Sequence, residues 1–244
     1  MEKHYPQILR QYMGEERDAG NGIIDDTTRD AAYICAASQA ASEAAKRPEL
    51  VSRKERSEYN EKIKTIEEAR LRNWAKQNDF WITEQNFLAV YESRFVASGA
   101  EQKVYLKEDG KKVIKVNLGR FHSTWLEYFN RLLFHAFLFP ATRYTTVGFT
   151  EEQGQFGVIT EQVFFTVSSG ATRDVVEPYL KSHGFERIKN EDYFNKDISV
   201  KLEDLHDENV LLDEDGNLLF IDPVIYFETV DLQLGGEMIF TFPW

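Results

Sequence analysis

The pattern of apolar and polar positions along the chain changes near residue 80. Before that point, Arg29–Lys46 is rich in Ala, Ser and Glu, follows N-cap candidates at 25–28, and is ended by Pro48. The next stretch, Glu49–Gln77, is mostly charged but carries apolar residues at steps of three and four positions. These positions are Tyr59, Ile63, Ile66, Ala69 or Arg70, and Trp74. Both stretches predict helices, and the narrow apolar stripe of the second predicts packing against the domain that follows, with a partner helix as the alternative.

Beyond residue 80, short apolar runs alternate with turn residues, which is typical of strands. Val96–Leu106 and Lys112–Val116 flank Glu108-Asp109-Gly110 and predict a hairpin. A helix is predicted over Ser123–Phe139, where Ser123 is the N-cap candidate and Pro140 is the stop. The other predicted elements are strands at Tyr144–Phe149 and Phe156–Phe165, a helix at Arg173–His183, and a second hairpin that joins Val210–Leu212 to Leu218–Ile221.

Composition narrows the classes of protein that fit. The 244 residues include 29 Lys and Arg against 41 Asp and Glu, a net charge of −12, which argues against general nucleic-acid binding because an acidic surface repels phosphates. Cys35 is the single cysteine, so neither an intrachain disulfide nor a cysteine-rich zinc site is expected. The longest apolar run, Leu132–Phe139, is far shorter than the roughly 20 residues that span a bilayer. Without a secretory signal pattern at the N-terminus, we expect a soluble cytoplasmic protein with no membrane contact.

The strongest chemical signal comes from two carboxylates and an amide around the second hairpin. Asn209 lies just before its first strand and Asp222 just after its second, so we expect the hairpin to bring the two residues side by side. Asp204 is one short loop away. Carboxylate and amide oxygens suit Mg²⁺, which keeps several waters and accepts substrate phosphate as a further ligand. The alternative reading, a polar turn with solvated carboxylates, stays open on spacing alone.

The wording of this segment resembles known phosphotransferases. Asp204-x-x-x-x-Asn209, followed 13 positions later by Asp222, resembles the catalytic loop and metal-binding Asp of the protein-kinase-like superfamily. Asp204-Leu205-His206 is closer to aminoglycoside and other small-molecule phosphotransferases. Asp-Leu-His-Asp-Glu-Asn with Ile-Asp-Pro also resembles the kinase-like domain in polyvalent proteins of phages and mobile elements. The resemblance implies a catalytic base at Asp204 and Mg²⁺ ligands at Asn209 and Asp222, and His206 lies within the matching loop.

The resemblance also implies partners upstream. Lys115, within Val113–Val116, resembles the strand lysine that contacts the α- and β-phosphates of ATP. Glu127, 12 positions later in the predicted helix, is the candidate for the acid that pairs with this lysine. The alternatives are a lysine on an exposed edge strand and a solvated glutamate on one face of the helix.

Two further segments would contact the nucleotide if the resemblance holds. Ser98-Gly99-Ala100 occupies the place of the phosphate-binding turn, although it has one glycine and matches neither G-x-G-x-x-G nor the Walker pattern. Val158–Val163 resembles the strand that leads to the adenine hinge. In that case the backbone carbonyl of Glu161 and the backbone N–H of Val163 face adenine, and Thr160 lines the back of the pocket.

We therefore expect an α+β protein with a minimal, two-lobed, protein-kinase-like fold. Residues 1–79 are expected to form an N-terminal helical segment, and 80–244 the kinase-like domain, with an N-lobe at about 80–163 and a C-lobe at about 164–244. The short stretch after Asp222 contains no Ala-Pro-Glu segment, so the C-lobe is expected to be reduced.

The function expected from this resemblance is transfer of the γ-phosphate of ATP, with Mg²⁺, to a hydroxyl of a protein or a small molecule. The alternative is a pseudokinase or nucleotide-binding module without catalysis, and an enzyme of the same fold that transfers AMP is a third reading. Expected partners are ATP and a hydroxyl acceptor, and the N-terminal helices are a candidate surface for a protein partner.

Overall fold

The computed structural model describes residues 25–44, 53–165 and 169–227. These residues form two compact units, one within Gly22–Phe165 and the other containing the described residues 169–227. Within the described part of the chain, no helix combines the length and apolar content that a membrane span requires.

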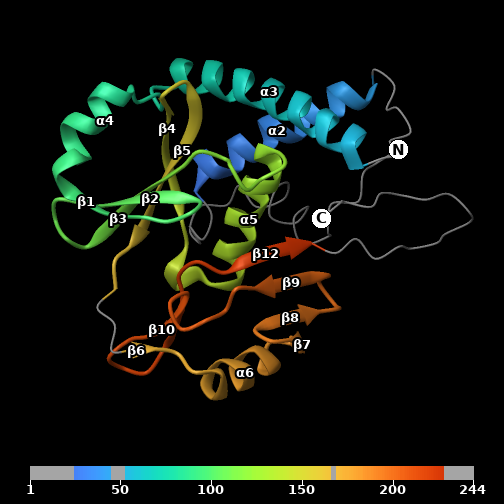
Figure 1. Ribbon diagram of the computed structural model, residues 1–244, viewed down its shortest axis with the longest axis vertical. Helices are drawn as coiled ribbons and strands as arrows, with labels where there is room; N and C mark the ends of the chain where they lie inside the picture. Colours follow the sequence, from blue (N-terminus) through green and yellow to red (C-terminus); the bar gives the residue numbers. More distant parts are fainter. Residues whose placement is uncertain (1–24, 45–52, 166–168, 228–244) are drawn as a thin grey trace, which may run out of the picture. The chain divides into compact units, whose positions relative to one another are not determined.

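The first unit is built from helices and one antiparallel sheet (Figure 1). Its helices are α2 (Asp26–Ala44), α3 (Arg53–Gln77), α4 (Glu84–Tyr91), η1 (Glu92–Arg94), α5 (Trp125–Leu138) and η2 (Pro140–Thr142). Its strands are β1 (Phe95–Ser98), β2 (Gln102–Leu106), β3 (Lys112–Asn117), β4 (Thr145–Glu152) and β5 (Gln155–Val163). Among the described residues, these strands form a five-stranded sheet in the order β1-β2-β3-β5-β4.

The two faces of this sheet differ in what they carry. Residues paired across antiparallel strands share a face, and successive residues of a strand alternate between faces. One face presents Tyr105, Ile114 and Ile159, which pack with Phe87 of α4 in an apolar cluster. The opposite face holds Lys115, which is paired with Val104 on β2 and with Thr160 on β5. The register of the sheet therefore separates a packing face under α4 from the face of Lys115.

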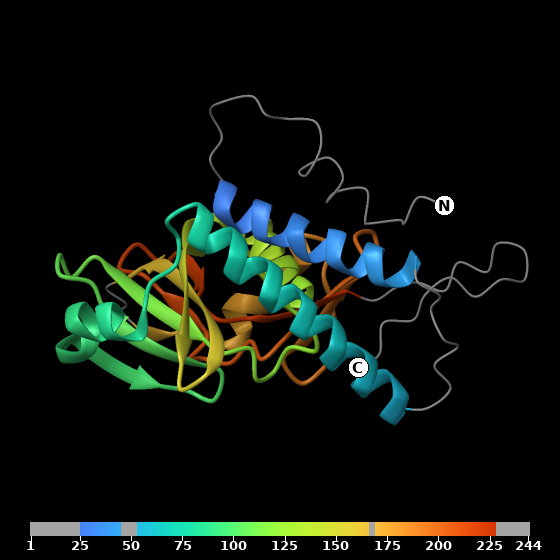
Figure 2. The same cartoon turned by 90° about the horizontal axis from the view of Figure 1, so that it is seen from above.

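Three helices of this unit pack together, and α2 and α3 lie side by side in both views (Figures 1 and 2). The N-terminus of α5 is their meeting point. Thr124 is its N-cap, and the Thr124 side chain accepts a hydrogen bond from the Glu127 N–H at 3.2 Å. Glu67 of α3 accepts a hydrogen bond from the Trp125 N–H at 2.7 Å. The first turn of α5 is thus held both by its own cap and by α3.

The second unit consists of helix α6 (Arg173–Ser182) and short strands. The strands are β6 (Ser169–Gly170), β7 (Glu186–Lys189), β8 (Asp192–Asn195), β9 (Val200–Glu203), β10 (Val210–Leu212), β11 (Leu218–Phe220) and β12 (Val224–Phe227). Within the described residues they form a three-stranded sheet, β11-β10-β6, and a four-stranded sheet, β12-β9-β8-β7. The hairpin predicted at Val210–Ile221 is the β10–β11 pair, which confirms that prediction.

The predicted helices are also present, with ends shifted by a few residues, and the α+β class is confirmed. Three details were wrong. The N-cap of α5 is Thr124 and not Ser123. The run Val96–Leu106 is not one strand, because it turns at Gly99 and pairs with itself as β1 and β2. In α3 the buried positions are Ile63, Glu67, Leu71 and Ala75, whereas Ile66 is 38% exposed. The buried positions are four residues apart and one of them is Glu67. A search for apolar residues alone could not identify this stripe.

Candidate active site

The residues with the carboxylates and amide singled out from the sequence lie at the ends of four short strands of the second unit. Asp204 directly follows β9, and the pairing of Glu203 with Val224 places it beside the turn that contains Asp222. The Ile221 N–H donates to the Asn209 carbonyl at 2.9 Å, which brings Asn209 next to the same turn. The register of the β9–β12 and β10–β11 pairs therefore gathers these backbones, as the hairpin argument predicts.

Hydrogen bonds join the loop side chains into one cluster. The Asn209 side-chain amide donates to the backbone carbonyl of Asp204 at 2.9 Å and to Asp204 Oδ2 at 3.0 Å. His206 Nδ1 accepts from the Glu208 N–H at 3.2 Å, and His206 Nε2 lies 3.1 Å from the side-chain amide nitrogen of Asn209. That Nε2 lies 3.4 Å from Asp204 Oδ1. Asn209 thus contacts one carboxylate oxygen of Asp204, and His206 lies near the other.

The backbone of Asp204 is held in a conformation that few residues other than glycine adopt. Its φ is +63°, in the left-handed region. Residues kept in such regions cluster at functional sites, because the surrounding structure must hold them there. Gly170 of β6 contributes to that surrounding structure, since a Cβ at this position would clash with the backbone and Cβ of Asp207. The close approach of β6 supports the loop from one side.

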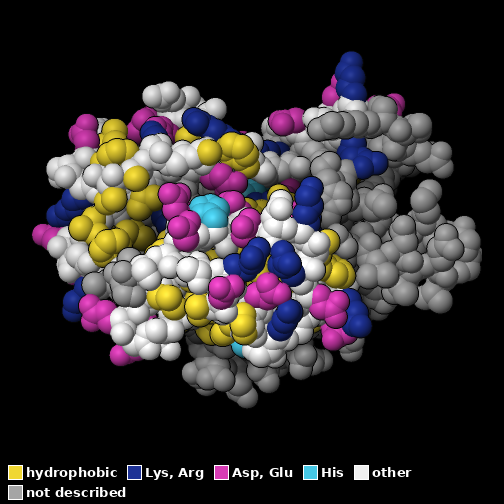
Figure 3. Space-filling view, turned by 60° about the horizontal axis from the view of Figure 1, so that its bottom comes forward, with side chains coloured by type: hydrophobic (Ala, Val, Ile, Leu, Met, Phe, Trp, Pro, Cys, Tyr) yellow, Lys and Arg dark blue, Asp and Glu magenta, His cyan; other side chains and the backbone are white. Residues whose placement is uncertain are grey.

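The carboxylates of this cluster are open to solvent. Asp204 and Asp222 are exposed and Asn209 is half-buried. Figure 3 shows one face of the molecule on which acidic side chains surround a histidine. No group of three or more His, Cys, Asp and Glu side chains suited to a metal occurs among the described residues. A cation held by Asn209 and Asp222 would therefore complete its shell with water or phosphate, as Mg²⁺ commonly does.

In the first unit, Lys115 is buried on β3, with 6% of its surface exposed. Its ammonium donates a hydrogen bond to the Tyr144 hydroxyl at 3.2 Å and lies 4.9 Å from the centroid of the Tyr144 ring. Thr160 is directly opposite on β5, on the same face of the sheet. The reading of Lys115 as an exposed edge residue is thus wrong, because β3 lies between β2 and β5.

Glu127 lies in the first turn of α5, where its carboxylate has local partners. Oε2 accepts from the Ser123 N–H at 3.0 Å, and Oε1 is 3.2 Å from Arg131. A carboxylate at this point also interacts favourably with the helix dipole. The predicted pairing of Glu127 with Lys115 stays a prediction.

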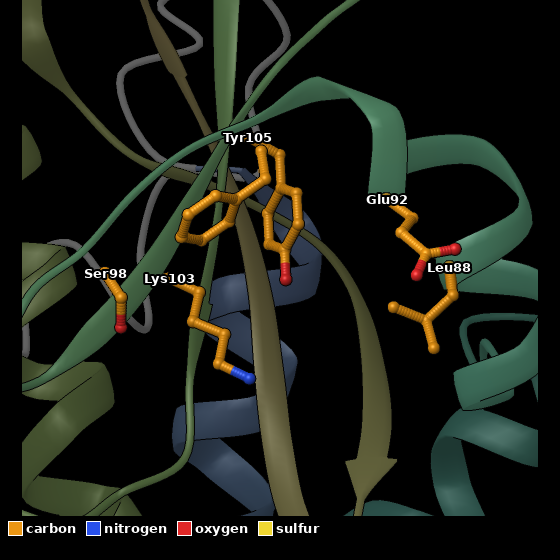
Figure 4. A pocket seen from close by; sticks show the side chains of 6 residues that line it. Leu88, Glu92, Ser98, Lys103 and Tyr105 are labelled. Atoms are coloured by element: carbon orange, nitrogen blue, oxygen red, sulfur yellow. The ribbon is translucent and has the colours of Figure 1, made fainter.

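The predicted phosphate turn joins β1 and β2, where the Gly99 N–H donates to the Gln102 carbonyl at 2.9 Å. Ser98 is paired with Lys103, so both side chains lie on the face under α4, opposite to Lys115. There they line a hollow of about 400 Å³ together with Leu88, Glu92, Phe95 and Tyr105 (Figure 4). A phosphate contact at Ser98 and Gly99 would therefore come from the backbone of the turn.

The two residues predicted to face adenine lie within β5. Glu161 is opposite Ile114, and Val163 is opposite Lys112. Burial raises the pKa of Glu161, but hydrogen bonds from Lys107 and Lys112 outweigh it and hold that pKa below its usual value. These bonds tie the end of β5 to the β2–β3 hairpin. The adenine contacts themselves stay a prediction.

A family model described as a serine/threonine/tyrosine kinase found in polyvalent proteins matches residues 64–229, more than half of the 244-residue chain. The chain belongs to this kinase family. The match confirms the resemblance drawn from the catalytic loop and includes all the candidate residues, from Ser98 to Asp222. No curated protein matches the chain.

The kinase match begins inside α3, and α2 and α3 belong to the same compact unit as the five-stranded sheet. That unit ends at Phe165. The lobe boundary predicted near residue 163 stays a prediction. The division predicted between residues 79 and 80 stays a prediction.

Sequence reasoning did not single out three residues that contact the candidate residues or the elements that carry them: Tyr144, Gly170 and Glu67. Tyr144 and Gly170 carry no spacing signal, because their partners lie far along the chain or in another strand. Glu67 did leave a signal, since it stands in line with Ile63 and Leu71 on one face of α3. Burial raises its pKa to about 7, although hydrogen bonds from the Trp125 and Leu126 N–H groups oppose the shift.

Proposed function

We propose that the chain is a Mg²⁺- and ATP-dependent phosphotransferase that moves the γ-phosphate to a hydroxyl of a protein or small molecule. The observation that carries the proposal is the hydrogen-bonded pair Asp204–Asn209 beside Asp222. Phosphoryl transfer needs positioning and charge stabilisation more than covalent help. An exposed carboxylate next to two oxygen donors for a metal provides both positioning and charge stabilisation, and all three residues lie at the ends of neighbouring strands.

Asp204 is proposed as the catalytic base. Its carboxylate is exposed, so an acceptor hydroxyl can reach it, and Asn209 and His206 fix its orientation. It would orient the hydroxyl and take its proton as the new oxygen–phosphorus bond forms. The bond from the γ-phosphorus to the bridging oxygen breaks, and ADP leaves.

Asn209 and Asp222 are proposed to hold Mg²⁺. The amide nitrogen of Asn209 is directed at Asp204, which leaves the amide oxygen for a cation. Together with a carboxylate oxygen this is a hard donor set that suits Mg²⁺. The bound ion would neutralise charge that develops on the phosphates during transfer.

The first unit is proposed to contribute contacts to ATP. Lys115 would contact the phosphates, and the backbone of the Ser98–Gly99 turn would do the same. Glu161 and Val163 would offer backbone groups to adenine. The support for these roles is the family match together with the shared face of Lys115 and Thr160.

The test of the site is a thermal-shift titration with ATP, with and without Mg²⁺. At 100 times the dissociation constant, ligand binding to the folded state adds about 2.7 kcal/mol of stability. We expect a Mg²⁺-dependent rise in melting temperature for the wild type and none for Asp222→Ala. Asp215→Ala, an exposed acid in the β10–β11 turn, is the matched control and should behave as the wild type. An equal shift in the wild type and Asp222→Ala would remove Asp222 from the site.

Release of ADP then separates transfer from binding alone. A panel of hydroxyl acceptors, protein and small-molecule, is incubated with labelled ATP, and both nucleotide product and acceptor are identified. ADP with a phosphorylated acceptor supports the proposal. Pyrophosphate with an AMP-modified acceptor would point instead to AMP transfer, and binding without either product would point to a module without catalysis.

One observation favours the nucleotide-binding module without catalysis. Kinases require an acid from the neighbouring helix at the strand lysine, and the carboxylate of Glu127 already contacts Arg131 and the Ser123 N–H. A nucleotide-binding module would keep a Mg²⁺-dependent thermal shift and release no ADP with any acceptor.

A further inference from the structure

A tyrosine is in contact with the strand lysine in this chain. Lys115 Nζ donates to the Tyr144 hydroxyl at 3.2 Å and lies 4.9 Å from the ring centroid. Both distances describe one contact, in which the hydroxyl end of the tyrosine faces the ammonium. A buried ammonium is costly unless polar partners replace water, and the Tyr144 hydroxyl is such a partner.

Tyr144 is itself fixed on two sides. Its ring packs edge-on against His135 of α5, with centroids 4.7 Å apart, and 7% of its surface is exposed. The segment just before it is tied to β5, because the Gln162 side chain donates to the Thr142 carbonyl at 2.6 Å. Tyr144 therefore links helix α5 to the lysine on β3 and has little freedom to change its rotamer.

The Tyr144 contact differs from an ion pair in one respect that matters for phosphate binding. A phenol is neutral near pH 7, so it orients the ammonium without cancelling its charge. A carboxylate at the same point would compete with a phosphate for that charge.

We propose that Tyr144 is the positioning residue for Lys115, holding the ammonium where it meets the phosphates of ATP. The inference rests on the role proposed for Lys115 in ATP binding. Tyr144 does not touch ATP in this proposal, and it acts through the lysine. A shift of α5 would move Tyr144 and, with it, the lysine.

Three variants isolate the contact. Tyr144→Phe removes the hydroxyl and keeps the ring, and Tyr144→Leu removes both. Tyr105→Phe is the matched control, because Tyr105 is buried to a similar extent on the opposite face of the sheet. A loss that follows from deleting any buried phenol oxygen would appear equally in the control.

The first measurement is the rate at which an amine reagent, trinitrobenzenesulfonate, modifies Lys115 in the nucleotide-free protein. Mass spectrometry of peptides gives the rate for each lysine, and Lys112 on the same strand, half-exposed, is the internal reference. Losing a hydrogen bond to a charged group favours the reactive neutral amine by about tenfold. We expect Tyr144→Phe to raise the ratio of Lys115 to Lys112 modification by about that factor, and Tyr105→Phe to leave it unchanged.

The second measurement is the dependence of turnover on ATP. The phosphates that Lys115 would contact are present in the ground state and the transition state alike. Tyr144→Phe should therefore raise KM for ATP about tenfold with little change in kcat, and Tyr144→Leu should raise it further. A merely structural role would lower the melting temperature and leave the modification ratio and KM at wild-type values, which would overturn the inference.

Protection of Lys115 from modification by bound ATP distinguishes the proposed ATP site at Lys115 from the proposed positioning role of Tyr144. In the wild type, Mg²⁺-ATP should slow modification of Lys115 and not of Lys112. If ATP gives no protection, the proposed ATP site at Lys115 fails, and with it the purpose assigned to Tyr144. If ATP protects but the Tyr144 variants keep the wild-type ratio and KM, the ATP site stands and the positioning role of Tyr144 fails.

Discussion

Lys115 and Asp204, the two most important side chains of the proposed mechanism, sit in opposite kinds of surroundings. Lys115 is buried in the middle of a sheet, and its partner Tyr144 lies 29 residues away along the chain. Asp204 is exposed, and its partners Asn209 and His206 lie within five residues. The lysine is placed by long-range packing, whereas the aspartate is placed by hydrogen bonds within its own loop.

This difference predicts that activity and stability separate between the two regions. An exposed loop held by local hydrogen bonds can lose a functional group at little cost to folding. A buried polar network loses stability whenever a partner is removed, because the remaining group stays desolvated. Substitutions in each region test this difference.

The largest expected effect is that of Asp204→Asn. The amide has the shape of the carboxylate but cannot accept a proton, so kcat should fall by about 10²- to 10⁴-fold. Because the side chain is exposed, the melting temperature should stay within a few degrees of the wild type. Steady-state kinetics and thermal unfolding on the same preparation check both halves. A variant that unfolds at a much lower temperature would show that the loop supports the fold and would break the contrast.

A smaller effect is expected for Glu67→Gln, measured as unfolding free energy against pH. The folded-state pKa of Glu67 is about 7 and the ordinary value is 4.5, so the folded state binds this proton more tightly. Stability from this group is fully present below pH 4.5 and is lost as pH rises to about 7. The loss should amount to about 3 kcal/mol, and it should be absent in Glu67→Gln.

This test depends on the difference in unfolding free energy between the wild type and Glu67→Gln at each pH, and not on the wild-type curve alone. Burial lowers the pKa of His122 to about 3, with nearby Arg131 and Lys64 adding to the effect, so His122 favours unfolding as the pH falls below 6.5. That contribution is common to both proteins and cancels in the difference. Parallel curves for the wild type and Glu67→Gln between pH 4.5 and 7 would contradict the buried-network reading.

The smallest effect is expected for Thr124→Ala at the N-cap of α5. The variant loses the hydrogen bond from the Glu127 N–H to the threonine hydroxyl, which should cost about 1 kcal/mol. Glu67 still accepts the Trp125 N–H, so α5 should remain folded. Chemical denaturation measures the loss, and a much larger value would mean that cap and glutamate act as one network.

The sequence predicted the elements whose signal is local. The helices α2 and α3 and the β10–β11 hairpin follow from caps, periodicity and turn residues. Helix α4 was missed because eight residues that bury only Phe87 give no periodic pattern. Strand β7 was missed because its four residues are all exposed and mostly charged, and pairing with β8 alone makes it a strand.

In the candidate site, too, local contacts could be predicted from the sequence and long-range contacts could not. The Asp204–Asn209 contact could be predicted because the loop and the hairpin bring the two residues together over five positions. The Tyr144 contact to Lys115 could not, because it depends on how the segment before β4 packs against α5. The side of the sheet on which Ser98 lies depends on the register of β1 and β2, which shifts between Phe95 and Ala97. A single-residue shift exchanges the two faces of a strand.

The left-handed backbone of Asp204 has an evolutionary consequence. Glycine adopts this conformation without steric penalty, and one nucleotide change converts an aspartate codon into a glycine codon. The aspartate then persists through its carboxylate, which accepts a hydrogen bond from Asn209 and is proposed to act on the acceptor. In a descendant that no longer transfers phosphate, replacement of Asp204 by glycine would remove the steric penalty of the left-handed backbone. The residue at this position therefore indicates whether a lineage has kept phosphoryl transfer.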